Sequence, residues 1–243
     1  YHSDEERFAQ YTGHITIPAT VDYQVVTYKV VAISAYTFYQ SSIDAIDLPD
    51  GLETIGREAF TYCENLRYLD IPDTVTTIGK AAFAGCESLR YVRLSESLRL
   101  MQPELFAGCS QLQTVLLGSQ IKNIGTKAFS DCQQLRTIYL PETVKKICPE
   151  AFYNCSHLKE LRIPDSVHIF DMNALAYCDE LSTLIFGPNI AGITPLKDNQ
   201  YLCPTIYVPR DKVDAYCKLG LESVREDVHA IEEMEEESFD ELM

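Results

Sequence analysis

Residues 66–86 read LRYLDIPDTVTTIGKAAFAGC and contain one complete copy of the unit that decides the fold. The pattern returns every 23 residues, with its cysteine at Cys63, Cys86, Cys109, Cys132, Cys155 and Cys178. A phenylalanine stands three residues before five of these cysteines, at Phe60, Phe83, Phe106, Phe129 and Phe152. A fixed period of about 20–50 residues indicates a stacked structural unit, because one copy cannot bury its apolar side chains alone.

Within one copy, the apolar residues predict a strand followed by a turn. Leu69 and Ile71 flank the polar Asp70, which is the alternation of a strand with one buried side. Gly79 suits a position that needs either a positive φ or a close approach of backbone. The Phe-x-x-Cys spacing fits one short helical turn. Strands of successive copies are therefore expected to pair in parallel.

The pattern Leu66-x-x-Leu69-x-Ile71-Pro72-x-x-Val75-x-x-Ile78-Gly79-x-x-Ala82-Phe83-x-x-Cys86 resembles the unit of the BspA-type leucine-rich repeats. The match covers about residues 13–220. The resemblance implies a right-handed leucine-rich-repeat solenoid of about eight 23-residue coils, with a parallel β-sheet face and short helical or irregular turns. It also implies a secreted or surface protein, usually bacterial, that acts in adhesion or protein binding and whose repeats carry no catalytic residue.

The regularity of the period divides the chain into four segments. Residues 1–42 are predicted to form a β-rich N-terminal cap with a first degenerate repeat, and residues 43–186 the regular repeats. Residues 187–225 are predicted to form an irregular last coil and a C-terminal cap, and residues 226–243 an acidic tail. Within the C-terminal cap, Asp211 is expected to begin a short helix that ends at Gly220.

The charge of the chain argues against nucleic acid as a partner. The formal net charge is −16, whereas neutralising phosphates needs a basic surface. The sequence contains no apolar run long enough for a transmembrane segment. A secreted or cell-surface location is expected, with a signal sequence removed before Tyr1.

The nine cysteines do not form a pattern that predicts chemistry. No two are spaced as Cys-x-x-Cys, which a zinc site favours, and no histidine shares their period. Phosphate-loop, zinc-protease and serine-nucleophile motifs are absent too. We therefore predict no catalytic residue, no cofactor and no metal, and we expect the six periodic thiols to be reduced and buried as small apolar groups.

The outward positions of the predicted strands are richer in Tyr and Arg than an acidic protein requires. Tyrosine and arginine are enriched at binding hot spots, although a solvated sheet also favours such residues. Leu116 and Ile185 are expected to add exposed apolar area to this surface. The predicted partner-binding residues are Arg67, Tyr68, Arg90, Tyr91, Arg93, Leu116, Tyr139 and Arg162.

Three functions are compatible with this sequence. The first is a noncatalytic secreted or cell-surface protein that recognises a protein or peptide through the outward face of the sheet. The second is a glycan-binding module that uses the tyrosine columns, which the absence of tryptophan weakens. The third, a hydrolase with an unrecognised site, has the least support from the residues.

Overall fold

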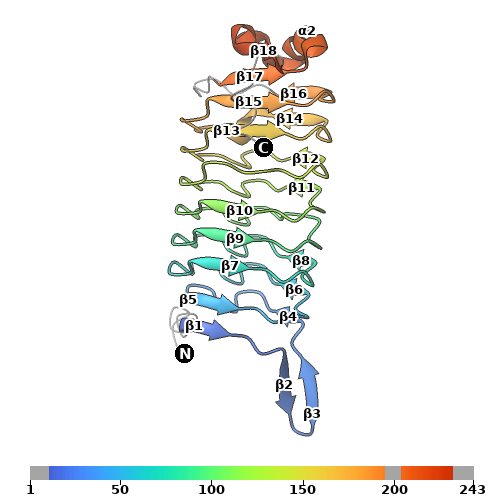
Figure 1. Cartoon of the computed structure of the whole chain (residues 1–243). Coiled ribbons are helices and arrows are strands. Elements are labelled where there is room, and N and C mark those ends of the chain that lie inside the picture. Colours follow the sequence, from blue (N-terminus) through green and yellow to red (C-terminus); the bar gives the residue numbers. More distant parts are fainter. Residues whose placement is uncertain (1–10, 195–203, 232–243) are drawn as a thin grey trace.

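The fold is a solenoid of about eight stacked coils of about 23 residues, as predicted. A computed structural model describes residues 11–194 and 204–231, and Figure 1 shows the coils stacked along one axis. Two faces of each coil carry strands that pair in parallel with those of the neighbouring coils. The third edge of the coil carries the Phe-x-x-Cys turns. One continuous apolar core runs through the stack.

The first face contains the predicted strands of the repeats, except at residues 137–140, and adds one strand, β18 (Val228–Ala230), that was not predicted. Tyr68, Leu69 and Asp70 pair in parallel with Tyr91, Val92 and Arg93 of the next coil. The middle residue of each strand is buried and its two neighbours are more accessible, which is the expected alternation. The strands of the first face are β1 (Thr12–Thr16), β5 (Ser42–Asp47), β7 (Tyr68–Asp70), β9 (Tyr91–Arg93), β10 (Thr114–Leu116), β13 (Glu160–Ile163), β15 (Thr183–Phe186), β17 (Thr205–Val208) and β18 (Val228–Ala230).

The second face carries shorter strands, which lie to one side of the first face in Figure 1. Several of them contain the apolar residue that precedes the repeated glycine. Ile55, for example, pairs with Ile78 of the next coil, and both side chains are buried. Leu100 joins this face through an isolated parallel bridge to Asn123. The strands are β4 (Ala32–Ile33), β6 (Thr54–Ile55), β8 (Thr77–Ile78), β11 (Asn123–Ile124), β12 (Lys146–Ile147), β14 (Ile169–Asp171) and β16 (Gly192–Thr194).

The third edge of the coils holds a stack of phenyl rings. Six rings, from Phe38 to Phe152, lie nearly parallel with neighbouring centroids 4.9–5.7 Å apart. The edge of the Tyr11 ring covers the first of them, at Phe38. Each ring is buried, and burying one phenylalanine contributes about 1.5–3 kcal/mol. This stack is a main source of contact between coils.

The periodic cysteines are buried next to the phenyl stack, as predicted, and they have a role beyond filling space. Each thiol donates to the carbonyl oxygen of the phenylalanine in the preceding coil, for example Cys86 Sγ to Phe60 O at 3.2 Å. The same bond recurs along the column at 3.0–3.3 Å. Backbone N–H groups of the column also donate to the phenylalanine of their own coil, as Cys109 does to Phe106 and Cys132 does to Phe129. The cysteine therefore ties one coil to the next.

The repeated glycine is required for close approach and not for a positive φ. A Cβ on Gly79 would lie 2.4 Å from Arg57 N, and one on Gly56 would lie 2.4 Å from Ala35 N. Neither glycine has a positive φ. Positive φ values occur at other positions of the repeat, such as the residue before each periodic cysteine. This residue is a glycine in two coils, Gly85 and Gly108, and a larger residue such as Tyr62 in the others.

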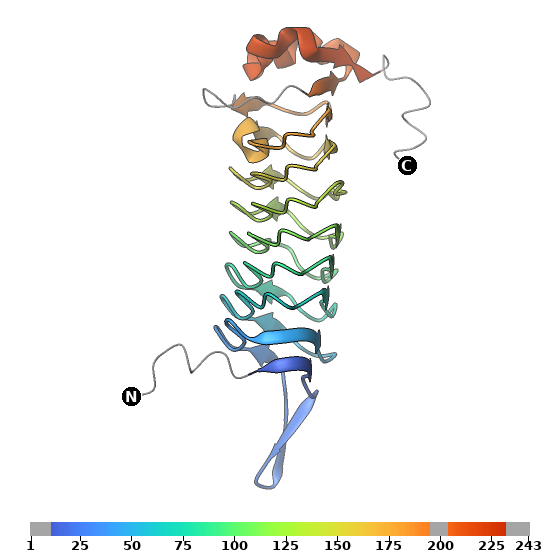
Figure 2. The ribbon, with the colours of Figure 1, turned by 90° about the vertical axis from the view of Figure 1, so that its left-hand side faces the viewer.

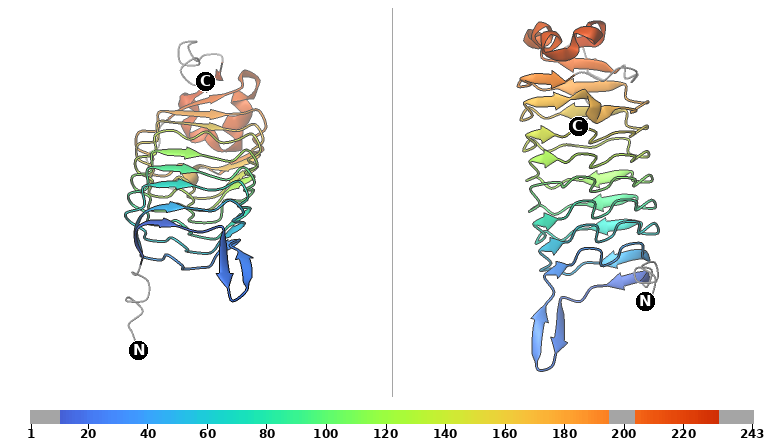
Figure 3. Two further views of the ribbon diagram at one scale, coloured as in Figure 1. Left: turned by 60° about the horizontal axis from the view of Figure 1, so that its bottom comes forward. Right: turned by 180° about the vertical axis from the view of Figure 1, so that it is seen from behind.

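An antiparallel hairpin projects from the N-terminal end of the stack, as Figures 2 and 3 show. It is formed by β2 (Thr20–Tyr23) and β3 (Val26–Lys29), and every residue of the two strands is exposed. Val21 pairs with Tyr28, and Tyr23 pairs with Val26, so these four apolar side chains share one side of the hairpin. The hairpin lies outside the apolar core of the solenoid.

The C-terminal end is closed by short helices instead of the single helix that was predicted. The segment runs through η2 (Arg210–Lys212), α2 (Val213–Tyr216), η3 (Cys217–Leu221) and η4 (Glu222–Asp227). The predicted roles of Asp211 and Gly220 are wrong. Asp211 lies inside η2 and caps nothing, and the helical path continues through Gly220 because the segment is held by tertiary packing.

Tyr216 shows how this cap is attached to the last coil. Its ring is buried, and its hydroxyl donates to Gly187 O and accepts from Ile190 N. β18 then adds a parallel strand beside β17, inside the segment predicted as an acidic tail. The remainder of that predicted tail, residues 232–243, lies outside the described residues.

Candidate functional site

The outward side of the first face brings the predicted binding residues into two neighbouring rows. Tyr68 of β7 lies beside Tyr91 of β9, and Arg93 lies between Asp70 and Leu116 in the parallel register. The Tyr68 side chain is 60% exposed, whereas Tyr91 is half-buried. Each residue of β7 pairs with the residue 23 positions later on β9, and β9 pairs with β10 in the same way. Residues 23 positions apart in the sequence are therefore adjacent on this surface.

Arg93, one of the predicted partner-binding residues, is held by two carboxylates of the preceding coil. Its Nε donates to Asp70 at 2.6 Å, and its Nη1 donates to Asp73 at 2.9 Å. Asp73 also accepts the backbone N–H of Glu96. That backbone bond, together with the Arg93 guanidinium, lowers the pKa of Asp73. The arginine therefore links β9 to β7 and to the loop that follows β7.

Other cations of the face form a row of exposed side chains without ion pairs in the part of the chain that the structure describes. Its members occupy the position just before the predicted first-face strand in their coils. Backbone hydrogen bonds join neighbouring members, such as Arg90 N to Arg67 O at 2.9 Å. Lys159 N donates in the same way to Arg136 O. The members are Arg67, Arg90, Arg136 and Lys159. This row gives the first face a basic margin on an acidic protein.

The first face is interrupted between β10 and β13. Residues 137–140 form no strand, and no backbone hydrogen bond joins them to either neighbouring strand in the described region. A small cavity of about 80 Å³ opens there, lined by Tyr139, Arg162, Glu142 and Glu160 among others. Burial raises the pKa of Glu160. Tyr139 is 73% exposed beside this notch.

The structure therefore divides the predicted site into two parts with Leu116 between them. Arg67, Tyr68, Arg90, Tyr91 and Arg93 lie together on β7, β9 and the residues before them, and Tyr139 and Arg162 lie beside the notch. The prediction that Ile185 is exposed is wrong, because only 8% of it is accessible. Arg162 of β13 and Tyr207 of β17 flank it in register and cover its side chain.

Comparison with known families identifies the repeat. The family model described as BspA type leucine rich repeat region matches in 6 copies, over residues 31–155 and 115–197. The chain belongs to the BspA-type leucine-rich repeat family. No match was found among curated proteins.

Solved structures of bacterial leucine-rich repeat proteins share this fold. A leucine-rich repeat protein from Bacteroides ovatus is 24% identical, with a TM-score of 0.60 over 80% of this chain and 63% of its own length. A protein from Eubacterium ventriosum is 26% identical, with a TM-score of 0.55 over 79% of this chain and 46% of its own. A leucine rich cell surface protein from Faecalibacterium prausnitzii is 22% identical, with a TM-score of 0.50 over 75% of this chain and 65% of its own. The BspA-type chain thus spans less than two thirds of these structures.

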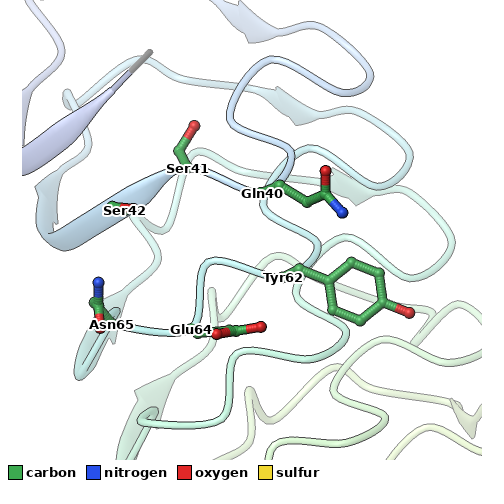
Figure 4. A pocket seen from close by; sticks show the side chains of 6 residues that line it. All are labelled: Gln40, Ser41, Ser42, Tyr62, Glu64 and Asn65. Carbon is green, nitrogen blue, oxygen red and sulfur yellow. The ribbon is translucent and has the colours of Figure 1, made fainter. Parts of the chain in front are cut away.

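The BspA-type solenoid also has a polar cavity at its N-terminal end, shown in Figure 4. It has a volume of about 390 Å³, and its lining residues are Gln40, Ser41, Ser42, Tyr62, Glu64 and Asn65. In Figure 4 Gln40 and Tyr62 point to one side, whereas Ser41 points away from both. No histidine or cysteine is among the residues that line this cavity.

Residues 11–194 and 204–231 contain neither a metal-binding cluster nor a membrane-spanning helix. This part of the chain holds no group of three or more side chains arranged to bind a metal ion. None of its helices is both long enough and apolar enough to cross a bilayer.

The sequence analysis overlooked one group of residues, a basic column on the second face. Arg99, Lys122, Lys145 and His168 are all exposed and follow one another at the 23-residue period. Backbone bonds of 2.8 Å join Lys122 to Arg99 and Lys145 to Lys122, which confirms that they are stacked. The 23-residue period could have revealed these residues. Each one directly follows a buried apolar residue of the repeat, such as Leu98 before Arg99.

Proposed function

We propose that this BspA-type chain is a noncatalytic binding protein, located at the cell surface or secreted, that recognises a protein or peptide through the outward side of the first face. The observation that carries the proposal is the proximity of exposed tyrosines to a row of cations that form no ion pair within residues 11–194 and 204–231. Tyr68, Arg67 and Arg90 lie in adjacent coils on a surface held rigid by parallel strands. Rigid aromatic and arginine side chains are typical anchors of protein interfaces.

The arrangement of the surface supports a long contact and not a pocket. The cavity beside Tyr139 is small, and the exposed residues extend along successive coils at a spacing of ~4.8 Å. Leu116, 48% exposed, adds an apolar patch between the Tyr68 cluster and Tyr139. Family membership supports the extracellular location and the binding role. A contact along several coils fits an extended segment of a partner protein.

The proposal is tested with a ligand found by screening the folded chain against displayed extracellular protein segments and, in parallel, a glycan array. The affinity of the strongest ligand is then measured for a Tyr68→Ala/Tyr139→Ala variant. Removing one hot-spot side chain costs ~2 kcal/mol, which is roughly a thirtyfold loss of affinity. We expect a loss of at least that size.

The matched control is Tyr36→Ala/Tyr177→Ala, which removes two accessible tyrosines from the turns of other edges. It is expected to bind as the unchanged chain does. Equal affinity in the first variant, or equal losses in both variants, would contradict the proposed surface. A glycan as the strongest ligand, with the same loss in the first variant, would favour the glycan-binding alternative.

A further inference from the structure

The second face carries its own concentration of positive charge. Arg99, Lys122, Lys145 and His168 occupy one column in consecutive coils, and Lys146 lies next to Lys145 on β12. The pairing of Lys146 with Ile169 places His168 beside Lys145. Consecutive coils lie ~4.8 Å apart, so the cations Arg99, Lys122 and Lys145 repel one another along the column, which the imidazole of His168 extends.

No carboxylate forms an ion pair with these side chains within the described part of the chain. Elsewhere on the solenoid, lysines pair with glutamates of neighbouring coils, as in Lys80–Glu104 and Lys127–Glu150. The cations of the second-face column form no such pair among residues 11–194 and 204–231. On a chain with a net charge of −16, an uncompensated basic column indicates a surface that is complementary to an acidic partner.

A hollow lies at the C-terminal half of this column. It has a volume of about 440 Å³, and its lining residues are Lys145, Lys146, Ile147, Pro149, His168, Ile169, Asp171 and Thr194. The one carboxylate among them, Asp171, accepts the backbone and side-chain N–H groups of Asn173 at 2.9 and 2.6 Å. Asp171 is therefore held by the turn that follows β14.

The hollow also presents an apolar side chain that the fold does not cover. Ile169 is 64% exposed, although it lies on a strand whose next residue, Phe170, is fully buried. An exposed isoleucine between Lys146 and His168 offers contact area to an aliphatic group, which a polysulfated sugar or a nucleic acid backbone lacks. The occupant that matches both features is a peptide with acidic and aliphatic side chains.

We propose that the second face binds an acidic peptide segment of a partner protein. Its carboxylates pair with Lys145, Lys146 and the cations further along the column, and an aliphatic side chain packs on Ile169. This surface lies on a different side of the coil from the tyrosines of the first face. Binding here is independent of the function proposed for the first face.

The experiment measures fluorescence anisotropy of a labelled peptide, (Glu-Glu-Leu)₃, titrated with the full chain at low and moderate salt. We expect saturable binding that weakens as salt rises, because the contacts are ionic. A Lys145→Glu/Lys146→Glu variant should bind at least tenfold more weakly. Both lysines are exposed and without ion pairs in the described residues, so the variant is expected to keep the melting temperature and circular dichroism spectrum of the unchanged chain.

Two further variants separate this proposal from its competitors. Lys29→Glu/Lys80→Glu makes the same change in net charge at two exposed lysines outside both proposed binding surfaces and should leave peptide affinity within about twofold, whereas an equal loss would overturn the proposal. Ile169→Ser should weaken binding of (Glu-Glu-Leu)₃ several-fold and leave the weaker binding of (Glu-Glu-Ser)₃ unchanged. Absence of saturable peptide binding would also overturn it, as would heparin binding more tightly with no sensitivity to Ile169→Ser.

Discussion

The phenylalanine–cysteine edge of the coils and the outward side of the first face differ in how strictly they repeat. At the edge, the same ring recurs with centroids 4.9–5.7 Å apart and interplanar angles of 6–14°. On the outward side, the column that contains Arg93 reads Asp70, Arg93, Leu116, Tyr139 and Arg162 in successive coils. The strict columns hold coils together, whereas the variable columns are available for recognition.

The difference follows from what each position contacts. A buried side chain in a stacked repeat touches the equivalent side chain of the coils before and after it, so one residue type must fit itself. An outward side chain has solvent on one side and tolerates many residue types. Stability is therefore expected to depend on the repeated residues and binding on the residues that break the repetition.

Among substitutions that test this difference, Phe106→Ala is expected to have the largest effect on stability. The ring is stacked on both sides, by Phe83 and Phe129, and no solvent reaches it. Its removal should lower the free energy of unfolding by about 3–5 kcal/mol, because a cavity remains between coils. Thermal unfolding should report a melting temperature that is lower by roughly 10 °C.

The control for this variant comes from the chain itself, since Leu175 occupies the same column and is fully buried. Phe106→Leu should therefore lose much less than Phe106→Ala. Equal losses in the two variants would show that ring stacking, and not buried volume, dominates the contact. A melting temperature unchanged by Phe106→Ala would contradict the role given to the stack.

A second, smaller effect is expected from the thiol column at alkaline pH. Burial raises the pKa of Cys109 and its neighbours above the ordinary value of 9.0, and raises that of Cys178 to about 12. The folded state thus keeps protons that the unfolded state loses. Stability from this source is fully present below pH 9 and decreases as the pH rises above it, by ~1.4 kcal/mol per thiol at one unit above the unfolded pKa.

This dependence is tested by urea unfolding at pH 8 and pH 10 with a Cys109→Ser/Cys132→Ser variant. Serine is tolerated in this column, because Ser41 occupies it in the first coil with 1% exposure. The variant should lose less stability between the two pH values than the unchanged chain, by up to about 2.8 kcal/mol. Identical losses would mean that tyrosine and lysine ionisation accounts for the alkaline effect.

The fold was predictable because its determinants are identical side chains at one spacing. The repeat placed Phe83 and Cys86 in the core and the strand at Leu69, all of which are buried in the structure. It could not place the bond from each thiol to the preceding Phe carbonyl, since the spacing of 26 residues reflects how adjacent coils are offset. From the sequence, Gly79 could serve either a positive φ or a close approach of backbone. The structure decides for close approach, because a Cβ there would lie 2.4 Å from Arg57 N.

The candidate site was predicted less well, because it depends on differences between coils. The ion pairs of Arg93 join it to Asp70 in the same column and to Asp73 in a loop, and only the first follows from the period. Ile185 is covered by Tyr207, whose coil begins after the break in the repeat. The basic column of the second face was overlooked because its strands are mostly two residues long.

The most direct test of the separation between buried columns and the outward face is urea unfolding of Tyr68→Ala/Leu116→Ala/Tyr139→Ala beside Phe106→Ala. The three outward side chains are 60%, 48% and 73% exposed, and substitutions at such positions usually change stability by less than about 0.5 kcal/mol each. The triple variant should therefore lose less than about 1.5 kcal/mol, well below the loss from the single buried ring. A triple variant destabilised as much as Phe106→Ala would show that the outward columns also hold the coils together.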